Sequence, residues 1–136
     1  MKKIKIVVVG AGPSGMMAAI RAKAFGQDVL LLEKKSALGN KLLLSGKGRC
    51  NLTNTEDIQY FLKRFSKGGD FLRDAFKRFF HPELISFFEE RGLELKVERQ
   101  MRVFPRSGRS SSVLDILKKE LEKLGVEILC ASKVVD

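Results

Sequence analysis

Six residues near the amino terminus, Gly10 to Gly15, have the glycine spacing of a phosphate-binding turn. In such a turn the first glycine permits a tight bend, the second lets the backbone approach a pyrophosphate, and the third lets a helix pack closely on a strand. The following helix offers free N–H groups and a partial positive charge to phosphate oxygens. Glu33 lies about 20 residues further on, where a carboxylate accepts hydrogen bonds from ribose hydroxyls. The residues of this predicted site are Gly10, Ala11, Gly12, Pro13, Ser14, Gly15 and Glu33.

The segments around the turn have the patterns of a strand, a helix and a second strand. Residues 4–9 form a β-branched apolar run, which is typical of a strand buried on both faces. Residues 16–24 continue as a helix, and Gly26 stands where a glycine commonly ends one. Residues 28–32 form the next strand, directly before Glu33. This context makes the glycine motif a strong prediction of dinucleotide binding, with flavin adenine dinucleotide (FAD) and nicotinamide adenine dinucleotide both open.

A further helix and strand of the same type come late in the chain. Residues 112–124 carry an apolar stripe at helical spacing, Gly125 ends that helix, and residues 126–130 form a strand. We therefore predict the α/β fold class, with a Rossmann-like βαβ…αβ parallel core. An α+β insertion of about residues 34–111 separates the second strand from the second helix.

The insertion has its own pattern of short helices and strands. We predict helices over residues 57–65, 70–80 and 83–91, then a strand over 93–98 with a hairpin partner at 101–104. Phenylalanines recur in the first two helices at helical spacing, which favours packing between helices over a stacking site for a flavin or nucleobase. The apolar residues expected to face one another there are Phe61, Phe65, Phe71, Leu72, Ala75, Phe76, Phe79 and Phe80.

Composition limits the function classes. The formal net charge of +10 is scattered along the chain, so an anionic partner such as the cofactor or a nucleic acid and a merely solvated basic surface both remain open. Apolar runs are too short for a membrane span, and the start lacks a signal-peptide pattern, so we expect a cytoplasmic location and no membrane partner. Cys50 and Cys130 form no C-x-x-C pair, which predicts free thiols and, with a single histidine, no metal site.

A second polar motif, GNKLLLSGKGRCNLTN, spans residues 39–54. Its glycines expose N–H groups, and Lys41 and Arg49 can offset pyrophosphate charge. Asn51 and the polar residues after it can bond the edge of a heterocycle, although a loop that only caps the sheet is the alternative. Cys50 has neither a partner cysteine nor an adjacent base, so a small residue packed near the cofactor is the favoured interpretation.

This motif, after the glycine turn and the sequence LLEK, closely resembles the BaiN-like family of bacterial NAD(P)/FAD-dependent oxidoreductases. MRVFPRSGRSSSVLDIL, residues 101–117, resembles a second signature of that family, and the resemblance covers essentially the whole chain. Gly108 and Arg109 depart from the family pattern, which affects only the substrate side. The resemblance implies FAD as cofactor, with the glycine turn at the pyrophosphate and Glu33 at the ribose. It also implies Lys34 near the adenosine, Lys41, Ser45, Gly46, Gly48, Arg49, Cys50 and Asn51 along the flavin and phosphates, and Val134 bonded to adenine through its backbone.

The implied activity is the transfer of hydride from NAD(P)H through FAD to a carbon–carbon double bond. A uridine in ribosomal RNA and a steroid-like compound are the implied substrates, and the catalytic residue stays unassigned. Family members are longer, so we expect residues 1–136 to be the amino-terminal part of an FAD-binding domain that lacks the substrate domain and a carboxy-terminal FAD-binding part. The alternative is a non-catalytic dinucleotide-binding fragment. An uncovered sheet would also favour self-association.

Overall fold

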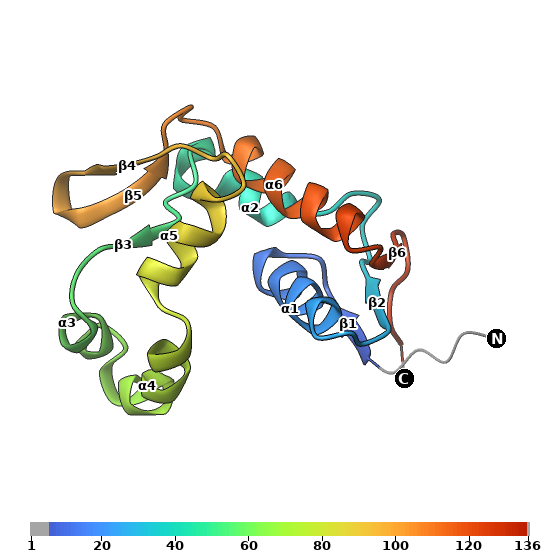
Figure 1. Ribbon diagram of the computed structural model, residues 1–136, viewed down its shortest axis with the longest axis horizontal. Helices are drawn as coiled ribbons and strands as arrows, with labels where there is room; N and C mark the ends of the chain where they lie inside the picture. Colours follow the sequence, from blue (N-terminus) through green and yellow to red (C-terminus); the bar gives the residue numbers. More distant parts are fainter. Residues whose placement is uncertain (1–5, 136) are drawn as a thin grey trace.

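Three parallel strands form the sheet that carries the glycine turn. In the computed structural model, which describes residues 6–135, β1 (Ile6–Val9), β2 (Val29–Leu32) and β6 (Glu127–Leu129) lie in the order β1-β2-β6 (Figure 1). Helix α1 (Pro13–Ala24) connects β1 to β2, and α6 (Ser110–Lys123) leads into β6. The predicted parallel core is confirmed, except that residues 4 and 5 of the expected first strand lie outside the described residues.

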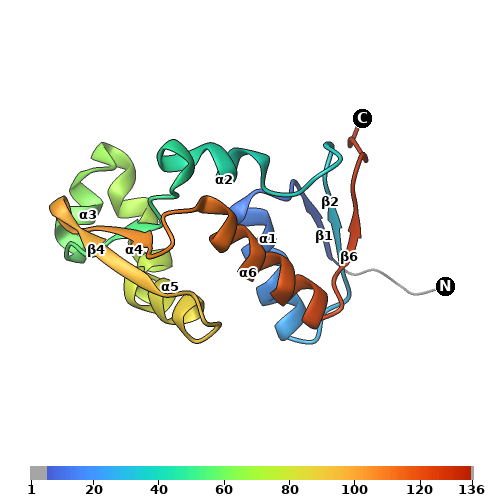
Figure 2. The ribbon, with the colours of Figure 1, turned by 90° about the horizontal axis from the view of Figure 1, so that it is seen from above.

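Helices α1 and α6 pack on the same face of this sheet (Figure 2). Because the strand order runs in one direction, right-handed crossovers place both connecting helices on one side. Val29 and Leu31 of β2 point toward these helices and are almost fully buried. The helices contribute most of the rest of this core, namely Met16, Ala19, Ile20, Val113, Leu114, Leu117 and Leu121.

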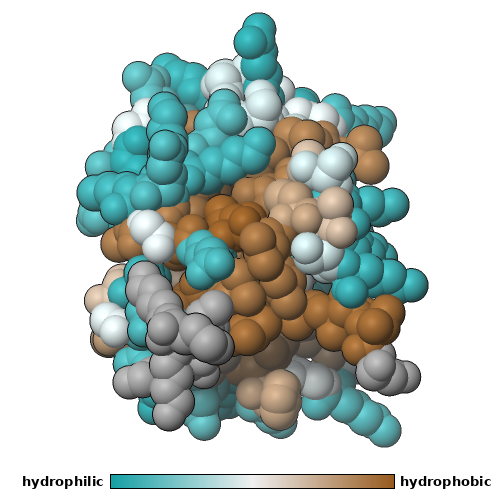
Figure 3. Space-filling view, turned by 90° about the vertical axis from the view of Figure 1, so that its right-hand side faces the viewer, coloured by the Kyte–Doolittle hydropathy of each residue, from teal (hydrophilic) through white to brown (hydrophobic). Residues whose placement is uncertain are grey.

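The opposite face of the parallel sheet is apolar and exposed. Val7 and Val9 of β1 expose 53% and 64% of their surface, and Leu129 of β6 exposes 45%. Figure 3 looks onto this side of the molecule, where apolar side chains form a broad area rimmed by hydrophilic ones. The expectation that the first strand is buried on both faces is therefore wrong for the described residues. Burial of both faces needs helices on each side of the sheet, and here both helices cover the same face.

The insertion forms a second lobe beside the parallel sheet (Figure 1). Its strands make a separate antiparallel sheet in the order β3-β5-β4, to which β3 adds a short strand that the sequence pattern did not reveal. The other predicted helices and strands are confirmed with small shifts at their ends. The elements of this lobe are α2 (Asn40–Leu44), η1 (Ser45–Gly48), β3 (Thr53–Asn54), α3 (Ile58–Lys63), η2 (Ser66–Gly68), α4 (Gly69–Arg78), α5 (His81–Glu89), β4 (Leu95–Glu98), η3 (Arg99–Met101) and β5 (Arg102–Pro105).

Aromatic packing holds the helices α3 and α4 together. The rings of Phe61, Phe65, Phe76 and Phe80 form five contacts with centroids 5.0 to 6.1 Å apart, and each contact is tilted or edge to face. Such geometry is favourable beyond the apolar area that it buries. The prediction of packing between helices is confirmed for these four rings. It is wrong for Phe71 and Phe79, which are 89% and 38% exposed.

An ion pair joins α5 of the insertion to α6 of the core. The Arg91 guanidinium donates from Nη2 to Glu120 Oε1 at 3.0 Å and from Nη1 to the carbonyl oxygen of Phe87 at 2.9 Å. It also lies 3.9 Å from the centre of the Phe87 ring. The hydrogen bond from Arg91 holds the pKa of the nearly buried Glu120 carboxyl below its usual value. The two lobes are therefore fixed relative to each other by a charged contact as well as by apolar packing.

We propose that the exposed sheet face, defined by Val7, Val9 and Leu129, leads the chain to self-associate, because exposed apolar patches favour contact with other surfaces. Sedimentation velocity of the unaltered chain should show dimers or larger species that grow with concentration. The double variant V9K/L129K should be monomeric. The matched control Val97→Lys removes an equally exposed valine from β4 and should behave like the unaltered chain. A monomer at every concentration for the unaltered chain would refute the proposal.

Candidate nucleotide-binding site

Gly10 and Gly15, at the two ends of the turn, occupy positions where a side chain would strain the backbone or clash with it. Gly10 has a φ of +96°, in the region that side chains disfavour. A Cβ on Gly15 would lie 1.9 Å from the carbonyl oxygen of Gly10, so only glycine lets α1 start this close to the end of β1. A Cβ on Gly12 would meet no atom within 4 Å and would project into open space. The turn therefore has a tightly closed base and an open side at Gly12, as a close approach of a phosphate requires.

Glu33 holds this turn from the end of the neighbouring strand. Its Oε2 accepts a hydrogen bond from the Ala11 backbone N–H at 2.8 Å, and its Oε1 accepts one from the Lys35 N–H at 2.9 Å. These two bonds, Lys35 first, lower the pKa of the Glu33 carboxyl, which is therefore ionised at neutral pH. A carboxylate has about four acceptor positions, so room remains for ribose hydroxyls.

The start of α1 has N–H groups that no side chain caps. The N-cap residue is Gly12, which has no side chain to accept a hydrogen bond from these N–H groups. Pro13 follows at the first helical position, and the first turn carries no acidic residue. Uncapped N–H groups at a helix start, with the positive end of the helix dipole, attract anions. In the described residues this helix start is thus free to bind a phosphate group.

A cavity of about 620 Å³ opens beside Gly12, Pro13 and Ser14. Six residues of the second motif reach its wall, and four of them are predicted site residues, namely Lys41, Ser45, Cys50 and Asn51. These four residues thus lie beside the glycine turn, and their contact with a cofactor stays a prediction. The apolar part of the lining is not apparent from the sequence motifs. That lining is made of Met17, Leu42, Leu52, Leu84, Phe88, Val113 and Leu117. Val113 and Leu117 belong to the apolar stripe of residues 112–124, whose helical spacing indicated only a helix that packs on the core.

The loop over residues 45–51 is folded tightly enough to fix the polar wall of the cavity. Ser45 Oγ donates to the carbonyl oxygen of Leu42 at 2.7 Å, and the Cys50 N–H donates to the carbonyl oxygen of Ser45 at 3.0 Å. Lys47 and Cys50 have positive φ values of 56° and 59°, which side chains rarely adopt. Such local strain persists only where surrounding contacts impose it, and it is frequent at functional sites.

The Cys50 side chain is buried, and burial raises the pKa of its thiol. At neutral pH the group is therefore a neutral thiol that packs in the cavity wall, which agrees with the interpretation as a small residue and not as a redox nucleophile. Both cysteines are free, and Cys130 lies exposed after β6.

Asn51 is oriented by the backbone of the antiparallel sheet. Its side-chain amide faces the carbonyl oxygens of Val103 and Thr53, so its nitrogen lies on that side and donates to them at 3.2 Å and 3.0 Å. The adjacent Leu52 N–H donates to the same Val103 oxygen at 2.8 Å. Asn51 is thereby held at the junction of the cavity and the β3-β5-β4 sheet.

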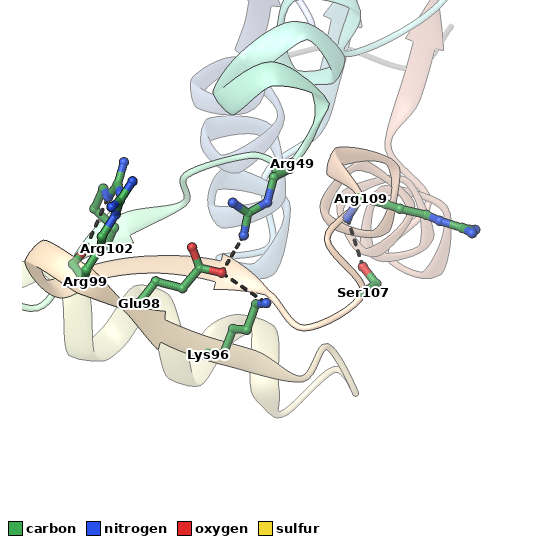
Figure 4. Close-up of polar contacts among 7 residues, drawn as sticks. All are labelled: Arg49, Lys96, Glu98, Arg99, Arg102, Ser107 and Arg109. Carbon is green, nitrogen blue, oxygen red and sulfur yellow. Dashed lines mark hydrogen bonds and ion pairs between the residues drawn. The ribbon is translucent and has the colours of Figure 1, made fainter.

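The predicted site residues Gly46, Gly48 and Arg49 do not line this cavity. The Arg49 guanidinium lies 4.2 Å from the centre of the Phe104 ring and pairs with Glu98 at 2.5 Å (Figure 4). These contacts tie the loop to the antiparallel sheet. A direct contact of these three residues with a cofactor stays a prediction.

Lys34 and Val134 lie at the other end of the site, beyond Glu33. The Ser132 N–H donates to the Glu33 carbonyl oxygen at 2.9 Å, so the chain after β6 runs beside the chain after β2. Lys34 is exposed, and its charge contributes to the lowered pKa of Glu33. Val134 is 52% exposed two residues beyond Ser132. Their predicted contacts with adenosine stay predictions.

Residues 6–135 contain neither a metal-ligating cluster nor a membrane-spanning helix. No group of three or more His, Cys, Asp or Glu side chains there could hold a metal ion. No helix of that part of the chain is long and apolar enough to cross a membrane. His81 packs against the Phe80 ring and does not line the cavity.

Comparison with known proteins agrees with this geometry. The family model of the HI0933-like protein Rossmann domain matches residues 4–136. The chain belongs to this family. It is 37% identical over 133 residues to a 3-dehydro-bile acid delta(4,6)-reductase of Clostridium scindens, and 30% identical over 129 residues to a ribosomal RNA dihydrouridine synthase of Haemophilus influenzae. These matches cover 96% and 94% of this chain but 32% and 31% of the relatives, so the chain spans about a third of their length.

The fold recurs in solved structures. A flavocytochrome c3 fumarate reductase superposes with a TM-score of 0.64 at 23% identity, over 96% of this chain and 27% of that one. The THI4 protein of Thermovibrio ammonificans superposes with a TM-score of 0.61 at 13% identity, over 94% of this chain and 38% of that one. At these identities the likeness concerns the fold. The family resemblance and the Rossmann-like fold expected from the sequence are both confirmed.

The two glycines Gly15 and Gly12 should respond differently to the same substitution. Gly15→Ala places its Cβ against the Gly10 carbonyl oxygen and should lower the free energy of unfolding by about 1–3 kcal/mol, as overpacking does. Gly12→Ala is the matched control, because its Cβ meets open space and should leave stability nearly unchanged. Urea unfolding followed by circular dichroism measures both. Equal stability losses for the two variants would contradict the geometry of the turn.

Proposed function

We propose that this chain is the FAD-binding portion of a flavin-dependent oxidoreductase that takes hydride from NAD(P)H and reduces a carbon–carbon double bond. The observation that carries the proposal is the turn closed by Glu33, with Gly12 open toward the cavity. Membership in the HI0933-like family supports it. The names of the two relatives support the reaction class, because a delta(4,6)-reductase and a dihydrouridine synthase are each named for adding hydrogen across a double bond.

The proposed site offers a separate group for each part of an extended dinucleotide. Glu33 would accept the ribose hydroxyls of the adenosine half, and the start of α1 would bind the pyrophosphate through its N–H groups. Lys41, which lines the cavity, would offset part of the phosphate charge. Glu33 and the start of α1 are already placed by contacts within the chain, so binding there would cost little reorganisation.

The cavity has the chemical character that a flat heterocycle requires. Apolar side chains such as Leu84 and Phe88 form much of its lining, whereas Ser45 and Asn51 supply polar atoms on another part of the wall. Ligand cavities commonly combine a mostly apolar lining with a few fixed polar groups. Bound FAD would supply the hydride transfer, while the chain binds and orients it and keeps water from the apolar side.

The substrate side of the proposal has two candidates, a small steroid-like molecule and a uridine in ribosomal RNA. The relatives carry these two specificities in their names. The net charge of +10 is compatible with an RNA substrate, which would make binding weaken steeply with salt. We propose no catalytic residue within this chain.

Glu33→Gln should weaken FAD binding by about tenfold to a hundredfold, because hydrogen bonds to a charged group contribute about 1.5–3 kcal/mol. Flavin fluorescence titration of both proteins measures the dissociation constants. Riboflavin, which lacks the adenosine ribose, is the control ligand and should bind both proteins equally. Glu127→Gln, on the exposed end of β6, is the control variant and should bind FAD like the unaltered chain.

Equal FAD affinities for the unaltered chain and Glu33→Gln would refute the placement of the ribose. If the unaltered chain fails to bind FAD, the cofactor itself is refuted. We expect FAD binding without consumption of NADH or NADPH, because the chain spans about a third of the length of the relatives it matches. Steady consumption of either nucleotide would contradict this expectation.

A further inference from the structure

A second cavity of about 620 Å³ lies in the insertion, against α3 and the β3-β5-β4 sheet. Asn51 lines this cavity as well as the nucleotide cavity, so the two adjoin at that residue. Neither the sequence motifs nor the proposed function accounts for it. Its wall combines three chemical features, namely aromatic rings, guanidinium groups without an acidic partner in the described part of the chain, and fixed polar backbone.

The aromatic part of the wall comes from the cluster that joins α3 and α4. Phe61 and Phe65 pack on Phe76 on one side and line the cavity on the other. Tyr60, from the same helix, also lines it. Tyr60 and Phe65 are 41% and 43% exposed. Flat apolar surface that remains accessible in a cavity suits a ring-bearing ligand.

Two arginines of this wall have no acidic partner among residues 6–135. Glu98 lies directly opposite Arg102 in the antiparallel register. Its carboxylate nevertheless turns to Arg49, at 2.5 Å, and to Lys96, at 3.0 Å (Figure 4). Arg102 instead donates from Nε to the carbonyl oxygen of Arg99 at 3.3 Å.

Arg64 is the second arginine, and its guanidinium contacts the Tyr60 hydroxyl and ring. Within residues 6–135, no carboxylate oxygen lies within 4 Å of the guanidinium of Arg64 or Arg102. Glu56 is the one acidic residue of the described cavity wall, against these two cations. The wall thus retains net positive charge for an anion.

The floor of the cavity is held in place by the turn before β5. Asn54 Nδ2 donates to the carbonyl oxygen of Gln100 at 2.8 Å, and the Thr55 N–H donates to that of Met101 at 2.9 Å. Gln100 and Met101 both have positive φ values, of 61° and 56°. Backbone strained in this way and held by hydrogen bonds is typical of preformed binding sites.

We propose that this cavity binds an organic anion with a flat apolar ring system, a carboxylate or phosphate, beside the nucleotide cavity. The rings of α3 take the apolar body, and Arg64 and Arg102 take the anionic group. The further step, that this ligand is the substrate presented to the flavin, rests on the proposed function. The observation that supports this step is that Asn51 lines both cavities. The binding itself does not depend on FAD.

Fluorescence titration with anthracene-9-carboxylate, without FAD, tests the binding. The double variant R64Q/R102Q should weaken binding by about tenfold or more, because charge-assisted bonds are lost. The control variant R78Q/R109Q removes the same charge from arginines outside this cavity and should leave binding unchanged.

The uncharged 9-anthracenemethanol should bind poorly to every protein. Phe65→Ser should weaken binding of the carboxylate through loss of the ring contact.

Three results would overturn the proposal: no binding of the carboxylate, equal binding of the alcohol, or an equal loss in the control variant. Competition by benzoate and by phenyl phosphate then distinguishes a carboxylate site from a phosphate site. Addition of FAD tests the adjacency, because a flavin next to the probe should quench anthracene emission. Loss of FAD binding with retained probe binding would refute the proposed function alone, whereas bound FAD without quenching would refute the adjacency alone.

Discussion

The hydrogen bond from the Ala11 N–H to the Glu33 carboxylate is the contact on which the proposed nucleotide site depends. Strands β1 and β2 are parallel, and Val9 pairs with Leu32 in their register. The residues that follow each strand therefore emerge side by side at one edge of the sheet. An acid at the end of β2 then reaches the glycine turn after β1 without any rearrangement. The close approach of Gly15 to the Gly10 carbonyl oxygen fixes the other side of the same turn.

The insertion completes the site because it brings a polar wall to a turn that has none of its own. The loop over residues 45–51 places Cys50 and Asn51 on the cavity, while Arg49 anchors the loop on Phe104 and Glu98. Arg91 and Glu120 join the insertion to α6, whose Val113 and Leu117 line the cavity. Glu98 pairs with Arg49 and Lys96 and not with Arg102, so the Arg102 guanidinium stays available to the second cavity. One set of ion pairs thus shapes both cavities.

Local patterns predicted the parallel core well because each of its signals has a local cause. Apolar runs, the glycine turn and the glycines that end α1 and α6 depend on backbone conformation within a few residues. The error at Val7 and Val9 has a different origin. An apolar run shows that a strand prefers burial, but the direction of the strand order decides which face the helices cover.

Non-local contacts account for what the sequence did not reveal. The apolar residues of the cavity, such as Phe88 and Leu117, have the spacing of ordinary core residues, and only the packing of four elements leaves a space between them. The two-residue strand β3 exists because Val103 supplies its partner from far along the chain. Arg49 has the charge to bind phosphate, but its pairing with Glu98 depends on a hairpin almost fifty residues away.

Amide NMR spectra recorded with FAD and with riboflavin test whether a dinucleotide binds at the glycine turn. We expect FAD to shift the amide signals of Ala11, Gly12, Ser14 and Gly15 and of the residues next to Glu33. Riboflavin, which has neither pyrophosphate nor adenosine, should leave these signals unchanged. Shifts confined to the exposed sheet face around Val7 and Val9, or equal shifts with both ligands, would contradict a dinucleotide site at the glycine turn.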